Sequence, residues 1–271
     1  MNNKIKSLLI DSYYVTEAYL QEIKKLTKVI YVDDLAAFSY PVDVLINYNI
    51  FSDDEKYKSL YGEEYEKIDF VLGCEYAPLR QEFVGHQRVA SEEVKSILIT
   101  SGGTDVYNLT GKLMNSLKEQ KWFSGVEIHV IVGRFNANKD ALEKEWNNSP
   151  NVHLHYNIPN IADYMKKCDI AVSAGGVTTY ELCACGIPTI MYTLADNQLE
   201  IAQTVSEKEL IFYAGDVREH IDCCVDNIIS RIDELRSNVV LRQEISVKML
   251  QTVDGHGCER LVDKVNSLRC L

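Results

Sequence analysis

One stretch, residues 169–198, constrains the fold of this chain more than any other, because its pattern alternates between strand and helix. It opens with an apolar run at residues 170–172, which is typical of a buried parallel strand. Gly175 and Gly176 follow, and their lack of a Cβ atom allows a ligand to approach the backbone. A helix is expected from about residue 177 to 185, followed by a second short strand at residues 189–192.

A glycine loop that opens a helix has a specific chemistry. It presents free backbone N–H groups and the positive end of the helix dipole, which suits a phosphate or a diphosphate. The alternative is an ordinary strand–turn–helix unit that needs glycine only for close packing. This stretch by itself leaves both interpretations open.

A second unit of the same kind occurs earlier in the chain. A strand expected at residues 96–100 leads into Ser101-Gly102-Gly103-Thr104-Asp105, and a helix is expected from about residue 107 to 118. Asp105 and the nearby Asn108 are also suited to simple helix capping. Two such loops in one sheet favour ligand contact over capping alone.

The rest of the chain shows a regular alternation of strands and helices. The segments expected as strands are residues 5–10, 28–32, 42–46, 96–100, 127–132, 152–156, 170–172, 189–192 and 211–213. Helical patterns separate most of them, which predicts a doubly wound α/β fold whose ligands bind beyond the carboxyl ends of the strands. A charged stretch at residues 91–95 indicates a boundary between two domains, residues 1–90 and 91–271.

Composition narrows the class of protein. The 271 residues are 46% apolar and 25% charged, as expected for a soluble globular protein, and the formal net charge of -12 argues against nucleic acid as a partner. No apolar run has the length of a membrane span, and the amino-terminal sequence has no signal-peptide core. The eight cysteines show no zinc spacing or C-x-x-C pair, so we expect reduced thiols, a cytoplasmic location and neither a metal nor a cofactor.

Glu181 is placed one turn into the helix that follows Gly176. A carboxylate at this place can accept hydrogen bonds from both hydroxyls of a ribose, as acidic residues do in nucleotide-binding α/β folds. The alternative is a solvated helix glutamate. Neither glycine loop has the G-x-G-x-x-G fingerprint or a G-K-[ST] sequence, so the pattern predicts no dinucleotide site and no Walker motif.

An ordered set of motifs gives the chain a family resemblance. The motifs are Gly73-x-x-Tyr76-Ala77-x-Leu79-Arg80-x-Glu82-Phe83, Ser101-Gly102-Gly103-Thr104-Asp105-x-x-Asn108, Ala174-Gly175-Gly176-x-Thr178-x-Tyr180-Glu181, Gly186-x-Pro188, Asp196-Asn197-Gln198 and Asp254-Gly255-x-Gly257-x-x-Arg260. Together they resemble the UDP-sugar hydrolase family of pseudaminic acid biosynthesis, a relative of the bacterial lipid II glycosyltransferase. Each motif is weak in isolation, whereas their order over nearly the whole chain is specific.

The resemblance implies a GT-B architecture of two Rossmann-like domains and a reaction in which water displaces UDP from the anomeric carbon of a diacetamido-trideoxyhexose. It also implies site residues. The diphosphate would be held by Gly102, Gly103, Thr104, Gly175, Gly176 and Thr178, the ribose by Glu181, the diphosphate or sugar by Asn197 and Gln198, and the uracil by the backbone near Ile158. Tyr13 matches a family tyrosine that assists in the active site.

One departure from the family pattern concerns catalysis. Family members begin with a strand and a Gly-x-Gly-His-x-x-Arg loop whose histidine is the proposed general base, and this sequence has no such loop before Asp11. We therefore expect a truncated amino-terminal domain with a sheet edge or face that a second chain or segment covers. His256 matches a carboxyl-terminal family element and His129 is interpreted as a core histidine, so neither is expected to be the base.

Three functions remain open from the sequence. The first is a nucleotide-sugar hydrolase that is incomplete as this chain, because an inverting hydrolysis needs a base to activate water. The second is the UDP-sugar-binding subunit of a split GT-B glycosyltransferase. The third is a non-catalytic protein that retains affinity for a UDP-sugar.

Overall fold

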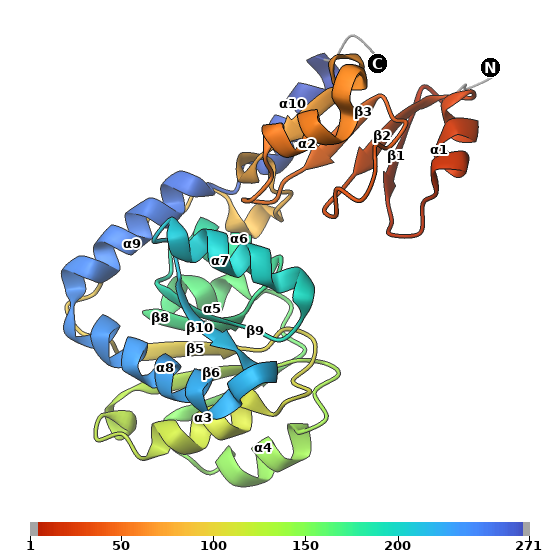
Figure 1. The fold of residues 1–271 in the computed structure, drawn as a ribbon. Helices are drawn as coiled ribbons and strands as arrows, with labels where there is room; N and C mark the ends of the chain where they lie inside the picture. Colours follow the sequence, from red (N-terminus) through yellow and green to blue (C-terminus); the bar gives the residue numbers. More distant parts are fainter. Residues whose placement is uncertain (1–4, 268–271) are drawn as a thin grey trace. The chain divides into compact units, whose positions relative to one another are not determined.

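The computed structural model describes residues 5–267, which form two compact units. The first unit contains the described residues up to Leu79 together with those from Gly255, and the second is Arg80–Asp254. Figure 1 shows the elements of both units, each of which is described here by itself.

The first unit is built on a parallel sheet of four strands in the order β1-β2-β3-β4. The strands are β1 Ser7–Asp11, β2 Lys28–Val32, β3 Val44–Asn47 and β4 Asp69–Leu72. The helices are α1 Glu17–Lys24, α2 Asp54–Tyr61 and α10 Gly257–Ser267, with 3-10 turns η1 Gly62–Lys67 and η2 Cys74–Tyr76. The strands β1, β2 and β3 lie close to where the sequence pattern predicts them, whereas β4 is a further strand.

The two faces of this sheet carry separate apolar clusters. One cluster contains Leu20 of α1 and Tyr57 and Tyr61 of α2. On the other face, Leu261 and Val265 of α10 pack against buried strand residues, which are Ile30, Val44, Ile46 and Val71. The last helix therefore contributes to the core of the first unit.

Close backbone contact explains why α10 belongs to the first unit. A Cβ atom on Gly257 would lie 2.0 Å from the carbonyl oxygen of Ala77, so only glycine permits this approach. Arg260 donates a hydrogen bond of 3.0 Å to the carbonyl oxygen of Glu75. The domain boundary inferred from the sequence, at residue 90, placed this helix in the second domain. That boundary was based on a charged stretch, and charge patterning carries no information on a backbone contact between distant segments.

The second unit is a doubly wound α/β domain on a parallel sheet of six strands, in the order β10-β9-β8-β5-β6-β7. The strands are β5 Ser96–Thr100, β6 Glu127–Val132, β7 Val152–Tyr156, β8 Ile170–Ala174, β9 Thr189–Thr193 and β10 Phe212–Asp216. The helices are α3 Leu109–Lys118, α4 Lys139–Trp146, α5 Ala162–Lys167, α6 Thr178–Cys185, α7 Leu199–Glu207, α8 Val217–Ser237 and α9 Val239–Thr252. The short turns are η3 Gln81–Phe83, η4 Phe123–Gly125 and η5 Asp196–Gln198.

The inner strands of this sheet lie in the core of the second unit. Every residue of β8 and β9 is buried, as expected for parallel strands that are covered on both faces. The sequence predicted the bounds of β5, β6 and β7 to the residue. No helix in the part of the chain that the structure describes has the length and apolar character needed to cross a bilayer.

Candidate functional site

The strand order of the second unit creates a topological switch point between β5 and β8. From β5 the chain proceeds to β6 and β7 on one side, and it then returns to β8, β9 and β10 on the other. Thr100 at the end of β5 pairs with Ser173 of β8, so the two glycine loops leave the sheet as neighbours. In open α/β sheets ligands bind at such a point, beyond the carboxyl ends of the strands.

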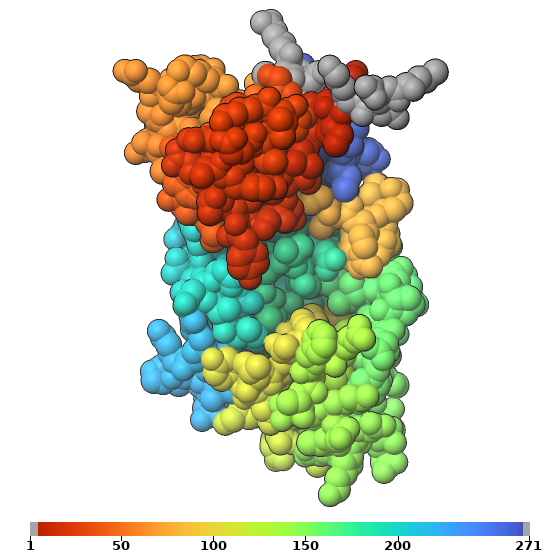
Figure 2. All heavy atoms as spheres, turned by 90° about the vertical axis from the view of Figure 1, so that its right-hand side faces the viewer, coloured from red at the N-terminus to blue at the C-terminus, as the bar shows by residue number. Residues whose placement is uncertain are grey.

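The glycine-loop edge reaches the surface of the second unit. Figure 2 shows yellow spheres from the segment near residues 100–110 and green to teal spheres from the segments near residues 170–200 on the same surface of this unit. Gly102 and Gly103 are exposed, and added Cβ atoms on them would have no neighbour within 4 Å. The backbone of the first loop is therefore open to a ligand.

Asp105 has a structural role in the first loop. Its carboxylate oxygens accept hydrogen bonds from the backbone N–H groups of Leu109, at 2.9 Å, and Thr110, at 3.0 Å. The residue is buried and caps the first turn of α3, so this carboxylate does not face a ligand. For Asp105, capping is the correct interpretation, and ligand contact by its side chain is not.

Gly133 at the end of β6 supports the first loop, and the sequence analysis missed this role. A Cβ atom on Gly133 would lie 2.2 Å from the carbonyl oxygen of Gly102 and 2.6 Å from Gly103. Phe135 also donates a backbone hydrogen bond of 3.0 Å to the carbonyl oxygen of Gly103. The first loop thus packs directly against the chain after β6. The only sequence signal for this role is the position of Gly133 immediately after a strand.

The second loop opens α6 with free space around its backbone. Gly176 has a φ of 123°, which favours glycine, and an added Cβ atom would have no neighbour within 4 Å. Among the residues that the structure describes, no side chain caps the amino end of α6. The N–H groups of Thr179 and Tyr180 donate hydrogen bonds of 3.0 Å to the carbonyl oxygens of Gly176 and Val177. What the start of this helix offers an anion is therefore its positive dipole end, together with the backbone of the loop before it.

Each glycine loop also carries a buried hydroxyl group. Within residues 5–267, the hydroxyl oxygens of Ser101 and Thr179 are buried and have no hydrogen-bond partner. Ser101 precedes Gly102, and Thr179 lies in the first turn of α6. Leaving a buried hydroxyl unpaired costs roughly 1–3 kcal/mol, and such groups are uncommon in folded proteins.

Glu181 lies in the first turn of α6 and its side chain is only 19% exposed. Its Oε1 is 3.7 Å from Nη2 of Arg80, and Nη1 of Arg80 is 2.9 Å from Glu82. Burial raises the pKa of the Glu181 carboxyl group, while Arg80 opposes this shift. A partly buried carboxylate with one distant cation retains acceptor capacity for hydroxyl groups.

The remaining predicted binding residues follow other strands of the same sheet. Gln198 lies after β9, accepts a hydrogen bond of 2.9 Å from the Leu194 N–H with its Oε1, and approaches Gly175. Asn197 beside it is exposed, and Ile158 follows β7 and is half-buried. The structure therefore brings all predicted nucleotide-sugar residues to the carboxyl edge of one sheet.

Tyr13, the predicted catalytic residue, lies in the first unit just after β1. It is 64% exposed, and its hydroxyl donates a hydrogen bond of 2.5 Å to Asp34 Oδ2. This bond and the nearby negative charge raise the pKa of Tyr13 to about 12. At neutral pH the group is a hydrogen-bond donor rather than a base.

The sequence pattern of the glycosyltransferase family 28 C-terminal domain matches residues 96–238. The chain belongs to this family. The matched region begins with β5 and ends after α8, so it contains both glycine loops, Gly133 and Glu181. The family 28 domain of this chain is thus the part of the second unit that carries the switch point.

Three relatives of known sequence resemble the chain over much of its length. An uncharacterized protein of Methanocaldococcus jannaschii is 29% identical over 73% of this chain and 42% of its own length. The spore coat polysaccharide biosynthesis protein SpsG of Bacillus subtilis is 21% identical over 96% of the chain and 76% of its own length. The UDP-2,4-diacetamido-2,4,6-trideoxy-beta-L-altropyranose hydrolase of Campylobacter jejuni is 25% identical over 66% of the chain and 63% of its own length. The chain therefore spans less than two thirds of two of these relatives.

Solved structures confirm the GT-B fold class. MurG of Acinetobacter baumannii superposes with a TM-score of 0.69 at 14% identity, covering 98% of this chain and 74% of MurG. The pneumococcal O-GlcNAc transferase GtfA, in complex with UDP and GlcNAc, superposes with a TM-score of 0.59 at 13% identity, covering 97% of this chain and 57% of GtfA. At these identities the likeness shows the fold alone.

Three histidines of the family 28 domain form a cluster on β6 and β7. His129 is half-buried rather than in the core, because it lies on the less buried face of β6, and its Nδ1 lies 3.0 Å from Nε2 of His155. His153 lies 2.5 Å from Glu127, and Tyr164 contacts His155. Within the described residues, no group of histidine, cysteine or acidic side chains is arranged to hold a metal ion.

This cluster makes stability depend on pH. Burial and the neighbouring imidazoles lower the pKa of His129 and His155 below 6.5, with Glu127 opposing and Lys167 reinforcing the shift for His129. The folded state therefore binds fewer protons than the unfolded chain. The contribution of these two histidines to stability is complete above pH ~6.5 and is lost as the pH falls below it.

The pH dependence can be tested by measuring the free energy of unfolding with urea across this range. A double variant that carries both His129→Asn and His155→Gln should lose less stability on acidification than the unaltered chain. The exposed His220→Gln variant is the control, and equal losses in all three proteins would contradict the assignment.

Two buried cysteines, Cys168 and Cys185, are unsuited to act as nucleophiles. Burial raises the pKa of Cys168 and of Cys185 to about 12, so both are thiols rather than thiolates at neutral pH. Among the described residues, seven cysteines form no disulfide bond: Cys74, Cys168, Cys183, Cys185, Cys223, Cys224 and Cys258. Cys270 lies outside the described residues.

Proposed function

We propose that this chain binds UDP or a UDP-sugar with the two glycine loops of its family 28 domain. The observation that carries the proposal is the pairing of Thr100 with Ser173, which makes both loops neighbours at the switch point of the sheet. Gly102, Gly103 and Gly176 leave open space there for a diphosphate. The names of the C. jejuni hydrolase and of the GtfA complex support a UDP-sugar as the ligand.

The proposed roles follow from where the residues lie. Thr104 and Thr178 hold the diphosphate together with the loop amides, and Glu181 accepts hydrogen bonds from the ribose hydroxyls. Asn197 and Gln198, after β9, contact the diphosphate or the sugar. The backbone near Ile158, after β7, receives the uracil.

The proposed reaction is hydrolysis of a UDP-diacetamido-trideoxyhexose, with water attacking the anomeric carbon and UDP leaving. Oriented amides and a helix dipole stabilise the departing diphosphate, and a base must take a proton from the water. Five of the described histidines contact other protein groups, and Tyr13 keeps its proton at neutral pH; these five are His86, His129, His153, His155 and His256. We therefore assign the base to a further segment or a second chain that completes the first unit.

A second function is favoured by the family itself, whose matching pattern is that of glycosyltransferases. In that case the chain supplies the UDP-sugar half of a split GT-B transferase, and the acceptor binds elsewhere. A third, non-catalytic function is simple UDP-sugar binding. All three share the same nucleotide site, so the first experiment tests binding and the second tests turnover.

Binding is tested by calorimetric titration with UDP, in the unaltered chain and in the Gly103→Ala variant. The added methyl meets no protein atom within 4 Å, so the free energy of unfolding should change by less than ~0.5 kcal/mol. Because the methyl occupies the space proposed for the diphosphate, UDP affinity should fall about tenfold. Gly125→Ala, which also meets no atom within 4 Å but lies away from the loops, should leave affinity unchanged. No binding of UDP by the unaltered chain would sink the proposal.

Turnover is tested by measuring UDP release from several UDP-sugars, with and without an added segment that carries the Gly-x-Gly-His loop. We expect little release by the chain alone and hydrolysis when the segment is present. Robust hydrolysis by the chain alone would refute the assignment of the base to another segment. Release that requires a sugar acceptor instead of water would favour the transferase.

A further inference from the structure

The strand β1 is an open edge of the first unit's sheet. Lys28 at the start of β2 donates a backbone hydrogen bond of 3.3 Å to the carbonyl oxygen of Lys6, and alternate residues of a parallel strand face the same neighbour. The residues between them therefore turn their N–H and C=O groups away from β2; these are Ser7, Leu9 and Asp11. No other strand within residues 5–267 pairs with β1 on that side.

One face of β1 is also uncovered. Leu9 lies beside Ile30 in the pairing of β1 with β2, so both side chains are on the same face of the sheet. Ile30 is 4% exposed because it belongs to the cluster that α10 covers, whereas Leu9 is 58% exposed. On the opposite face, Ile10 packs against the cluster that contains Leu20 of α1. Parallel sheets are normally covered on both faces, so β1 lacks one of its two layers.

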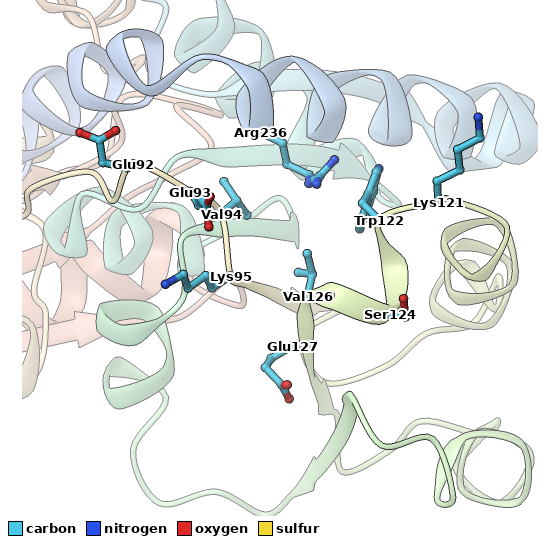
Figure 3. Close-up of a pocket in the computed structure, with 11 residues that line it drawn as sticks. Glu92, Glu93, Val94, Lys95, Lys121, Trp122, Ser124, Val126, Glu127 and Arg236 are labelled. Carbon is cyan, nitrogen blue, oxygen red and sulfur yellow. The ribbon is translucent and has the colours of Figure 1, made fainter.

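Exposed apolar side chains are concentrated around β1. Among the residues that the structure describes, fifteen large apolar side chains are exposed, and seven of them lie between residues 5 and 35. Two of the seven, Ile5 and Tyr13, lie on either side of β1. The cavity of about 720 Å³ in the second unit differs, since Figure 3 shows charged side chains such as Lys121 and Glu127 around it. A concentration of exposed apolar groups is typical of a contact with another polypeptide.

A second copy of this chain would not cover both the edge and the face. Pairing of β1 with its own copy about a two-fold axis is antiparallel and keeps the same face of both sheets on the same side. The copy would therefore fill the open edge. It would bring a second uncovered Leu9 to the same face, so the apolar surface would stay open in both copies.

A strand followed by a helix would cover both features. The strand would pair in parallel with the open edge of β1, as all other strands of this sheet do. Connections between parallel strands are right-handed, and α1 lies on one face where the chain winds from β1 to β2. A segment that winds outward from the added strand, in the opposite direction, places its helix on the other face. That face is the one on which Leu9 is exposed.

Relatives have enough additional sequence for such a unit, which takes roughly 20 residues. The match with SpsG of B. subtilis covers 96% of this chain but 76% of SpsG, and the match with MurG covers 98% of this chain but 74% of MurG. About a quarter of each relative therefore has no counterpart in these 271 residues.

We propose that a polypeptide segment outside these 271 residues docks on β1, as a parallel strand on its open edge and a helix over Leu9. The loop after a parallel strand emerges at the carboxyl edge of the sheet, beside Asp11 and Tyr13. Because the winding reverses between the added strand and β1, this place becomes the topological switch point of the first unit. The base that the proposed function requires would be carried by this loop, next to Tyr13, and this part of the inference rests on that function.

Docking can be measured with a defined probe, the part of B. subtilis SpsG that this chain does not match, produced as a separate polypeptide. Calorimetric titration should show saturable one-to-one binding. In the ¹⁵N-labelled chain, hydrogen exchange at the Leu9 amide should be fast and should slow at least about tenfold in the complex, while the Ile10 amide, which faces β2, is protected in both. The absence of binding, or a Leu9 amide as protected as that of Ile10 without the probe, would overturn the proposal.

The matched variants are Leu9→Lys and Val240→Lys, because the two side chains are 58% and 61% exposed. Both variants should unfold at the same urea concentration as the unaltered chain. Leu9→Lys should weaken binding of the SpsG segment at least about tenfold, since a charge on an edge strand opposes pairing and apolar cover. Val240→Lys, on α9, should bind like the unaltered chain. Undiminished affinity in the Leu9→Lys protein would contradict the proposal. Light scattering that shows a dimer of the unaltered chain, lost in Leu9→Lys, would assign the surface to a second copy and also overturn it.

Docking is measured without UDP, so its failure is distinct from failure of the proposed function. A segment that binds at β1 but leaves UDP release unchanged would support the docking and refute the placement of the base. No binding of the segment, together with intact affinity for UDP, would refute the docking and leave the nucleotide site in place.

Discussion

Replacing Glu181 with alanine should weaken UDP binding by about 1–3 kcal/mol, the range for losing a charged hydrogen-bond partner. The carboxylate lies in the first turn of α6, just after the second glycine loop, where both ribose hydroxyls can donate to it. Calorimetric titration with UDP measures the loss. Glu145→Ala, an exposed carboxylate on α4, is the matched control and should bind like the unaltered chain. Unchanged affinity in the Glu181→Ala protein would mean that the ribose assignment is wrong.

A Glu181→Gln variant distinguishes lost binding from lost folding. Burial raises the pKa of Glu181, so the folded state holds its proton more tightly than the unfolded chain. Stability contributed by this group therefore falls as the pH rises through the raised pKa, and the ionised form costs stability at neutral pH. The glutamine variant should unfold at the same or higher urea concentration than the unaltered chain while it binds UDP more weakly. Lower stability in this variant would show that the ion pair with Arg80 outweighs desolvation.

Replacing Gly133 with alanine should destabilise the second unit by about 1–3 kcal/mol, because the added methyl overlaps the backbone of the first glycine loop. The new Cβ atom would lie 2.2 Å from the carbonyl oxygen of Gly102, which cannot move without moving the loop. UDP affinity should fall as well, since the loop amides lose their positions. Urea unfolding and UDP titration measure the two effects. Gly125→Ala again serves as the control, and full stability in the Gly133→Ala protein would contradict the observed contact.

Most of the elements could be predicted from local pattern. The strands of the second unit are short apolar runs bounded by glycine and polar residues, and β5, β6 and β7 were located to the residue for this reason. The strand β4 was not recognised, because its four residues include Asp69 and follow a long polar segment. A run of this length carries too little periodicity to identify a strand.

The candidate site was predicted in part. Both glycine loops and Glu181 were found from residue type and spacing, because glycine and a carboxylate near a helix start have direct chemical meaning. The capping role of Asp105 was one of two open interpretations, which the hydrogen bonds to α3 decide. His129 was expected in the core because its neighbours along the strand are apolar. Successive side chains of β6 alternate between a buried and a half-buried face, and His129 lies on the half-buried one.

The sequence by itself determined the α/β fold class, the two glycine loops and the carboxylate that follows the second loop, because each of these depends on residues close together in the chain. Only the tertiary structure decided which loops are neighbours, through the pairing of β5 with β8 across about seventy residues. It also decided that Gly133 supports the first loop and that α10 completes the core of the first unit. These contacts join distant segments through packing and backbone approach, which leave no periodic signal in a single sequence.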